Sequence, residues 1–133
     1  MDAAVREFVR KRADNRCEYC GLEQSFVDHA PFAVEHIIAK QHRGSDEMSN
    51  LALACDRCNA FKGPNIAGLD PQTGNLVPLF NPRMHLWREH FAFAGSLVIG
   101  LTPEGRTTVE ILNMNATERV QLRAEAQEGD EES

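Results

Sequence analysis

Four cysteines form two matching pairs in this sequence, Cys17-x-x-Cys20 and Cys55-x-x-Cys58, and no other cysteine is present. Each pair can present two thiolates to one tetrahedral ion, and four sulfurs close a zinc site against solvent. A thioredoxin-like redox motif needs only one such pair, and a secreted disulfide scaffold normally has more cysteines in a shorter chain. The spacing therefore predicts a structural zinc ion held by Cys17, Cys20, Cys55 and Cys58.

A histidine between the two cysteine pairs could act as a general base. Hydrolysis needs a group that takes a proton from water. His36 is the candidate general base, because an unperturbed imidazole is partly neutral at neutral pH and can accept a proton. A lone histidine in a strand is more often an ordinary half-buried residue, but the flanking cysteine pairs favour the catalytic interpretation.

Several motifs between residues 10 and 65 agree in spacing at once. They are Cys17-x-x-Cys20, Glu35-His36-Ile37, Gly44, Asn50-Leu51, Cys55-x-x-Cys58-Asn59 and Lys62-Gly63. This series resembles the zinc-ribbon HNH endonucleases, in the variant whose last histidine is asparagine. Any single pair would be weak, but the combined series is specific.

The resemblance implies a ββα-metal finger, in which two strands and one helix hold a catalytic divalent ion beside the structural zinc. Asn50 would orient the ring of His36, and Glu35 and Asn59 would be the oxygen ligands of the catalytic ion. A site with hard oxygen ligands and open positions for water and phosphate suits Mg²⁺ or Mn²⁺.

Two departures from the commonest pattern leave the catalytic ion open. Glu35 stands where aspartate or histidine is more usual, and Asn59 replaces the final histidine, so zinc or nickel are alternatives. Adjacent residues of a regular strand point to opposite faces. Glu35 and His36 can therefore face one phosphate only if the backbone twists there, or if the phosphate lies at the edge of the strand.

Other polar residues of the series have a substrate-binding and a structural interpretation. Lys62 and Arg43 are candidates for contacts with substrate phosphate, but Lys62 could equally complement the dipole at a helix C-terminus. Asn50 could be only a loop or cap residue, and Asn59 could make only local hydrogen bonds in the first turn of a helix.

Hydrophobic patterns predict the elements that position the motif. We expect an amphipathic helix at residues 3–13 and a strand at 32–38 that is part of a hairpin-like pair. A short helix is expected at 56–62, because Gly63 offers a C-terminal cap and Pro64 forbids continuation.

The second half of the chain has weaker signals. Residues 65–83 are rich in proline and glycine and are expected to form an irregular wrapping segment. Beyond it, the patterns predict core positions for Trp87 and Phe91, and then three elements: a strand at 96–101, a helix at 108–112 and a helix at 116–126 with Asn115 as its cap. Arg83 and His90 could border a substrate groove.

The charge is uneven along the chain, although its net value is −6. Residues 1–90 carry 11 Lys and Arg against 12 Asp and Glu, whereas residues 91–133 carry 3 against 8. This distribution permits DNA as a partner but argues against very tight nonspecific binding at physiological salt. With no signal peptide, no apolar run near the ~18 residues of a membrane span, and thiolates suited to a reducing compartment, we expect a cytoplasmic protein without membrane contact.

The sequence thus predicts an α+β protein: a ββα-metal finger braced by a four-cysteine zinc ribbon, with an N-terminal helix and a small strand and helix extension. We expect one nuclease domain at 1–123, with the motif core at about 10–65 and the extension at about 66–123, followed by a flexible acidic tail at 124–133. The expected activity is metal-dependent hydrolysis of DNA that nicks one strand per site. Two alternatives are a non-catalytic zinc module that binds nucleic acid or protein, and a nuclease that reads modified bases. The oligomeric state is left open.

Overall fold

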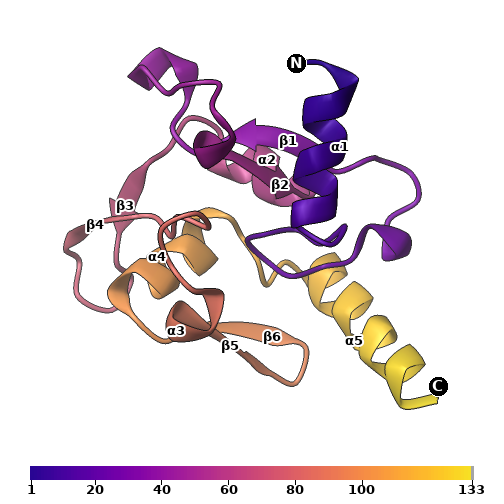
Figure 1. Ribbon diagram of the computed structural model, residues 1–133. Helices are drawn as coiled ribbons and strands as arrows, with labels where there is room; N and C mark the ends of the chain where they lie inside the picture. Colours follow the sequence, from indigo (N-terminus) through magenta and orange to yellow (C-terminus); the bar gives the residue numbers. More distant parts are fainter. Residues whose placement is uncertain (133) are drawn as a thin grey trace.

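The computed structural model describes the backbone of residues 1–132 and the side chains of residues 1–128. Its strands form three separate two-stranded antiparallel sheets, surrounded by five α-helices and three short 3₁₀ helices in the described part. The predicted α+β class is therefore confirmed. Figure 1 shows the first hairpin beside the N-terminal helix and the last helix leaving the body of the molecule toward the C-terminus.

The first hairpin and the helix after it give the order strand, strand, helix that the sequence predicts. Strand β1 (Ala33–His36) pairs with β2 (Leu51–Ala54), and His36 lies opposite Leu51. All four residues of β2 are buried, as expected for an apolar run without polar alternation. Helix α2 (Asp56–Lys62) follows directly and ends at Gly63, whose φ of 49° suits a residue without Cβ.

Helix α1 (Ala3–Arg12) lies against this hairpin. The side chain of Asp2 caps it by accepting a hydrogen bond from the backbone N–H of Val5 at 2.9 Å. Val9 is fully buried and Val5 is half-buried, whereas Arg6 and Lys11 are exposed, so one face of the helix packs against the hairpin as predicted. Phe8 of the predicted apolar face is 48% exposed and does not join this packing. The 3₁₀ helices are η1 (Gln24–Phe26), η2 (Lys40–His42) and η3 (Met48–Asn50).

The prediction of an irregular segment at 65–83 is wrong, because a second hairpin lies within it. Strands β3 (Ala67–Leu69) and β4 (Leu76–Pro78) pair in register, with Ala67 opposite Pro78. A proline at the end of an edge strand is compatible with this pairing, since its missing N–H need not enter the ladder.

A third hairpin and two helices complete the extension. Helix α3 (Trp87–His90) leads into β5 (Phe91–Ala94), which pairs with β6 (Leu97–Gly100). Strand β6 matches the prediction, but β5 was not predicted. Phe80, Phe91 and Val98 join Tyr19 and Leu51 in one core that links the extension to the first hairpin.

The two C-terminal helices differ from their predicted bounds. Helix α4 (Pro103–Ile111) begins five residues before the predicted start, with Pro103 in its first turn and Thr102 as its cap. Helix α5 runs from Thr117 to Glu132. Asn115 does not cap it, because its side chain exchanges two hydrogen bonds of 2.9 Å with the backbone of Val98.

The predicted acidic tail at 124–133 lies partly outside the described residues. In the part of the chain that is described, we find no helix with the length and apolar character needed to cross a membrane.

Candidate functional site

The four cysteines meet at one point although 35 residues separate the two pairs. Cys17 and Cys20 follow α1, while Cys55 and Cys58 lie where β2 passes into α2. All four are buried, and their sulfurs lie within 4.8 Å of one another. The backbone N–H groups of Cys20 and Cys58 donate to the sulfurs of Cys17 and Cys55, at 3.5 and 3.4 Å. This buried set of four sulfurs fits a tetrahedral zinc ion.

Two arginines of α5 lie beside the cysteine cluster. Arg119 and Arg123 are each 4% exposed, and three of their buried nitrogens have no hydrogen-bond partner among the described residues. Burial lowers the pKa of Arg123, while negative charge on Cys20, Cys58 and Cys55 opposes the change. A zinc ion with four thiolates carries excess negative charge, so these guanidinium groups are placed to offset it.

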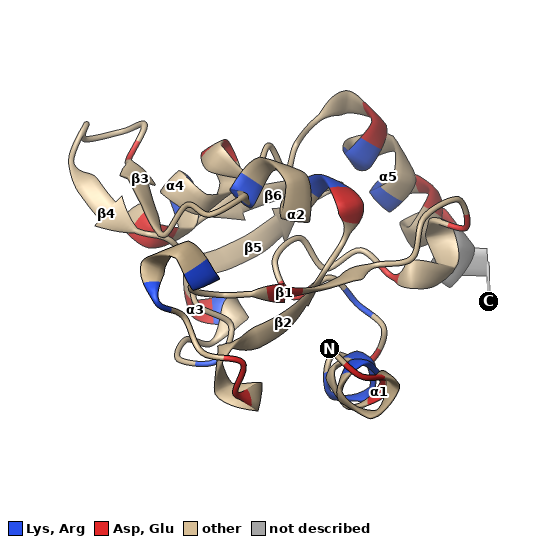
Figure 2. Ribbon diagram, turned by 90° about the horizontal axis from the view of Figure 1, so that it is seen from above, with Lys and Arg blue, Asp and Glu red and all other residues tan. Residues whose placement is uncertain are grey.

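Helix α5 is also joined to the second cysteine pair by two ion pairs. Arg119 donates to Asp56 at 2.5 Å, and Arg57 lies 2.5 Å from Glu118. Figure 2 shows charged residues of both signs where α2 and α5 approach each other. The extension is therefore tied to the helix that carries Cys58 of the second cysteine pair.

The side chains of Glu35 and His36 point to opposite faces of β1, as the alternation of a regular strand requires. Glu35 is 7% exposed; its carboxylate accepts hydrogen bonds from the hydroxyl of Tyr19 and from Nζ of Lys62, the latter at 3.1 Å. Burial raises the pKa of Glu35, and the positive charge of Lys62 only partly opposes this. Nζ of Lys62 also donates to the carbonyl of Ile37 at 2.9 Å, so this lysine holds β1 against α2.

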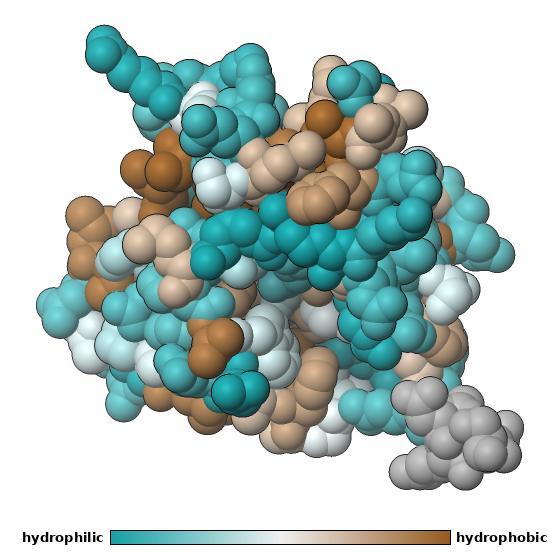
Figure 3. Space-filling model, viewed as in Figure 1, coloured by the Kyte–Doolittle hydropathy of each residue, from teal (hydrophilic) through white to brown (hydrophobic). Residues whose placement is uncertain are grey.

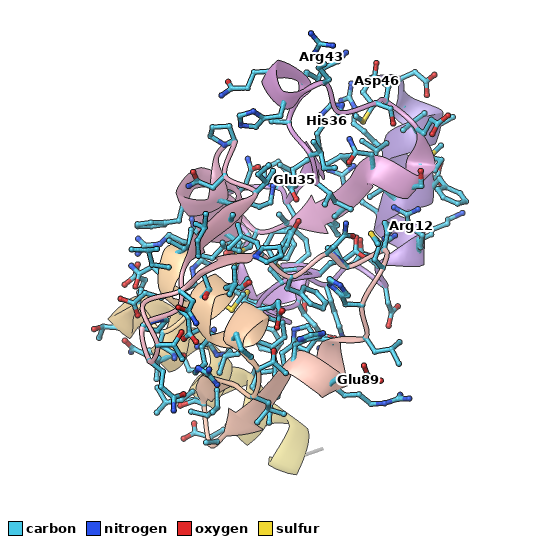
Figure 4. All side chains as sticks on the ribbon, turned by 90° about the vertical axis from the view of Figure 1, so that its left-hand side faces the viewer. Arg12, Glu35, His36, Arg43, Asp46 and Glu89 are labelled. Carbon is cyan, nitrogen blue, oxygen red and sulfur yellow. The ribbon has the colours of Figure 1, made fainter. Side chains whose placement is uncertain are left out.

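His36 points to the other side of the strand, where it meets a carboxylate. Nε2 of His36 lies 2.7 Å from Oδ1 of Asp46, and Nζ of Lys40 donates to Oδ2 of the same residue at 2.9 Å. Hydrogen bonds from Lys40 and then from His36 lower the pKa of Asp46, which keeps it ionised. The three side chains line a cavity of about 300 Å³ that also touches Asp2. Figure 4 shows His36 and Asp46 together, with Glu35 deeper in the molecule.

Asn50 is buried and holds the loop that carries Asp46. Its side chain accepts from the backbone N–H of Ile38 at 2.9 Å, and donates to the carbonyls of Ile38 and Ser45 at 3.0 and 2.8 Å. A Cβ on Gly44 would lie 1.7 Å from the carbonyl oxygen of Ile38, so only glycine fits under this loop. Asn50 therefore contacts the backbone after His36 and not its ring.

The other predicted site residues are placed as follows. Asn59 is half-buried in α2, one turn before Lys62, and its backbone bonds to Cys55 and Gly63. Arg43 is exposed and has a left-handed backbone with φ of 69°. Lys62 is 2% exposed, so in this conformation its ammonium group does not reach a phosphate in solvent.

A catalytic divalent ion at Glu35 and Asn59 fits this arrangement poorly. Carboxylate and amide oxygens are suitable ligands, but the ammonium group of Lys62 is already bound to Glu35 and would repel a second cation. Among the described residues, the four cysteines are the one cluster of at least three His, Cys, Asp or Glu side chains with ligand atoms this close.

Comparison with known proteins finds a family similarity in the segment that holds these residues. A family model described as HNH endonuclease matches residues 17–65. The similarity to that family lies in this segment. The segment contains both cysteine pairs, the β1–β2 hairpin and α2, which confirms the predicted relationship.

The similarity to one relative covers more of this chain than residues 17–65. The Septu protein PtuB of Bacillus thuringiensis is 25% identical over 122 residues, which cover 87% of this chain. The chain spans only 43% of the length of that relative. No solved structure matches.

Sequence patterns missed two residues of the site. Asp46 lies ten residues after His36 in a polar loop, and no spacing rule links a loop carboxylate to a strand histidine. Tyr19 lies inside the first cysteine pair, and its contact with Glu35 depends on how the segment with this pair packs against β1.

Proposed function

We propose that this chain is a metal-dependent endonuclease that hydrolyses phosphodiester bonds of DNA and nicks one strand at each site. The observation that carries the proposal is the pairing of His36 with Asp46 at an open cavity of the HNH domain. A histidine held by a carboxylate is the usual arrangement of a general base whose tautomer is fixed.

We infer the following roles for His36, Asp46 and Lys40 in this cavity. When Nε2 of His36 donates its proton to Asp46, the lone pair of Nδ1 is free to take a proton from water. Asp46 then stabilises the imidazolium that forms. Lys40 holds the second oxygen of Asp46 and brings positive charge to the place where a phosphate would lie.

A divalent ion, when bound, would stabilise negative charge on the phosphate and the leaving oxygen. Glu35 and Asn59 stay proposed ligands of that ion, on the condition that Lys62 releases Glu35. The roles of His36, Asp46 and Lys40 do not depend on where the ion binds.

The alternative is a non-catalytic zinc module that binds nucleic acid. The pairing of Glu35 with Lys62 favours it, since this pairing supplies a cation from the protein where a metal ion was expected.

Cleavage of supercoiled plasmid tests the proposal. The zinc-loaded protein is incubated with plasmid and either Mg²⁺, Mn²⁺ or no added ion, beside a His36→Ala variant that retains its zinc. We expect nicked circles only with the wild type and an added ion. A folded, zinc-loaded protein that nicks with none of these ions would be the binding module, and equal nicking by His36→Ala would remove His36 from the reaction.

A further inference from the structure

A second concave surface lies between the first cysteine pair and the extension. This cavity, here called the Trp87 groove, has a volume of about 470 Å³ and is lined by Arg12, Arg16, Glu18, His85, Trp87 and Phe93 among others. Its volume is within the range of sites for small organic ligands. The roles proposed for His36, Asp46 and Lys40 do not involve this groove.

One wall of the groove is aromatic and rigid. Nε1 of Trp87 donates to the carbonyl of Tyr19 at 2.7 Å, which fixes the indole ring. The ring centroids of Phe91 and Phe93 lie 5.2 and 5.1 Å from that of Trp87. Phe93 is 48% exposed, so the wall ends in an aromatic ring that solvent reaches. A wall of this kind offers a stacking surface to a planar ligand.

The rim of the groove is cationic. Arg12 is exposed, and among the described residues its guanidinium donates to the backbone carbonyls of Met48 and Leu51 and has no carboxylate partner. Glu18 is the acidic side chain of the lining, but it is paired with Arg83 and accepts from the backbone N–H of Leu53. The net charge that a ligand meets at Arg12 is therefore positive.

The rim is connected to β2, the strand that pairs with the one carrying His36. Nη2 of Arg12 lies 2.6 Å from the carbonyl oxygen of Leu51, the residue that pairs with His36 across the hairpin. Figure 3 shows one face of the molecule, on which hydrophilic residues lie between separate apolar clusters. This surface suits a chain with charged and planar parts better than a purely apolar one.

We propose that the Trp87 groove binds an unpaired nucleotide of the substrate, with its base stacked on the aromatic wall and its phosphate at Arg12. Stacking is available to every base and not to a base held inside a duplex, so the groove selects single-stranded or extruded nucleotides. This proposal rests on the proposed nuclease function and adds the class of substrate.

Fluorescence of Trp87, the single tryptophan of the chain, reports occupancy directly. The zinc-loaded full chain, without added Mg²⁺ or Mn²⁺, is titrated with a short single strand of thymidine nucleotides and with an abasic strand of equal length and charge. We expect saturable quenching by the thymidine strand and affinity at least about tenfold lower for the abasic strand, in line with the usual contribution of base stacking. Equal affinity for both strands, or no change in emission, would overturn the proposal.

Two matched variants of the third hairpin test whether the thymidine strand binds at the Trp87 groove. Phe93 lies on the same face of the sheet as Val98, whereas Ile99 pairs with Ala92 on the opposite face and is 40% exposed. Phe93→Ala is expected to weaken thymidine binding about tenfold and Ile99→Ala to leave it unchanged. Equal effects of the two variants would also contradict the assignment.

The same preparations separate this proposal from the nuclease proposal. Plasmid nicking without base-dependent quenching would overturn the proposal of a nucleotide site in the Trp87 groove and would leave the nuclease proposal intact. Base-dependent quenching without nicking would confirm the groove as a nucleotide site and identify the chain as a binding module.

Discussion

The two sides of the β1–β2 hairpin use similar residue types for different purposes. On the buried side, Glu35 is paired with Lys62 and contacts Tyr19. On the open side, the carboxylate of Asp46 is paired with Lys40 and contacts His36. The side chain of Asp46 is 65% exposed, against 7% for Glu35. Exposure, more than residue type, therefore separates a structural ion pair from one that can serve a reaction.

The largest expected effect is on the buried side, at the four cysteines proposed to hold zinc. Structural zinc contributes on the order of 10–16 kcal/mol in small zinc modules. Cys20→Ser removes one of four ligands, so we expect loss of zinc and of cooperative unfolding. The measurements are zinc content and a circular dichroism melt. A variant that folds normally without zinc would show that the cluster does not support the hairpin.

Lys62→Met tests the buried ion pair. Removing one partner of a buried pair typically costs about 3–5 kcal/mol, since the other charge is left without compensation. The matched variant Lys40→Met removes an exposed lysine and should change the free energy of unfolding by about 0.5 kcal/mol or less. Urea denaturation of both variants measures the difference. Similar losses of free energy of unfolding in the two variants would contradict the distinction between a buried structural pair and an exposed pair.

Asp46→Asn sharpens the comparison on the open side. The amide keeps the shape but loses the charge that fixes the tautomer of His36 and stabilises the imidazolium. We expect the nicking rate to fall at least about tenfold, but by no more than the ~10²–10⁴-fold that a general base contributes, with the urea midpoint unchanged. Wild-type nicking by this variant would show that His36 does not depend on Asp46.

The pH dependence of stability should have opposite signs on the two sides. The pKa of Glu35 is raised in the folded protein, so its contribution is full at low pH and is lost as the pH rises through that raised pKa. The pKa of Asp46 is lowered, so its contribution is present above its unfolded pKa and is lost as the pH falls through the folded value.

Urea midpoints between pH 4 and pH 7 check these signs. Relative to Glu35→Gln, the wild type should lose stability across this range as the pH rises. Relative to Asp46→Asn, it should gain stability slightly or not at all. A wild type that gains stability over Glu35→Gln with rising pH would contradict the sign assigned to Glu35.

The metal cluster and the finger were predictable because their signals are local. The cysteine spacing specifies a set of four ligands, and Gly63 before Pro64 ends α2 at Lys62. The second hairpin is not predictable in the same way, because proline and glycine favour an irregular segment at 65–83, whereas Pro78 in the structure lies at the end of an edge strand. Asp46 was missed because its position depends on Asn50, which holds the loop through hydrogen bonds from twelve and five residues away.

The central claim is that the open side of the hairpin carries the reaction while the buried side carries stability. Initial nicking rates of His36→Ala on supercoiled plasmid, measured with its urea midpoint, test it most directly. We expect nicking to fall by ~10²–10⁴-fold while the urea midpoint stays at the wild-type value. Nicking at the wild-type rate would contradict the claim, as would a midpoint that falls as far as that of Lys62→Met.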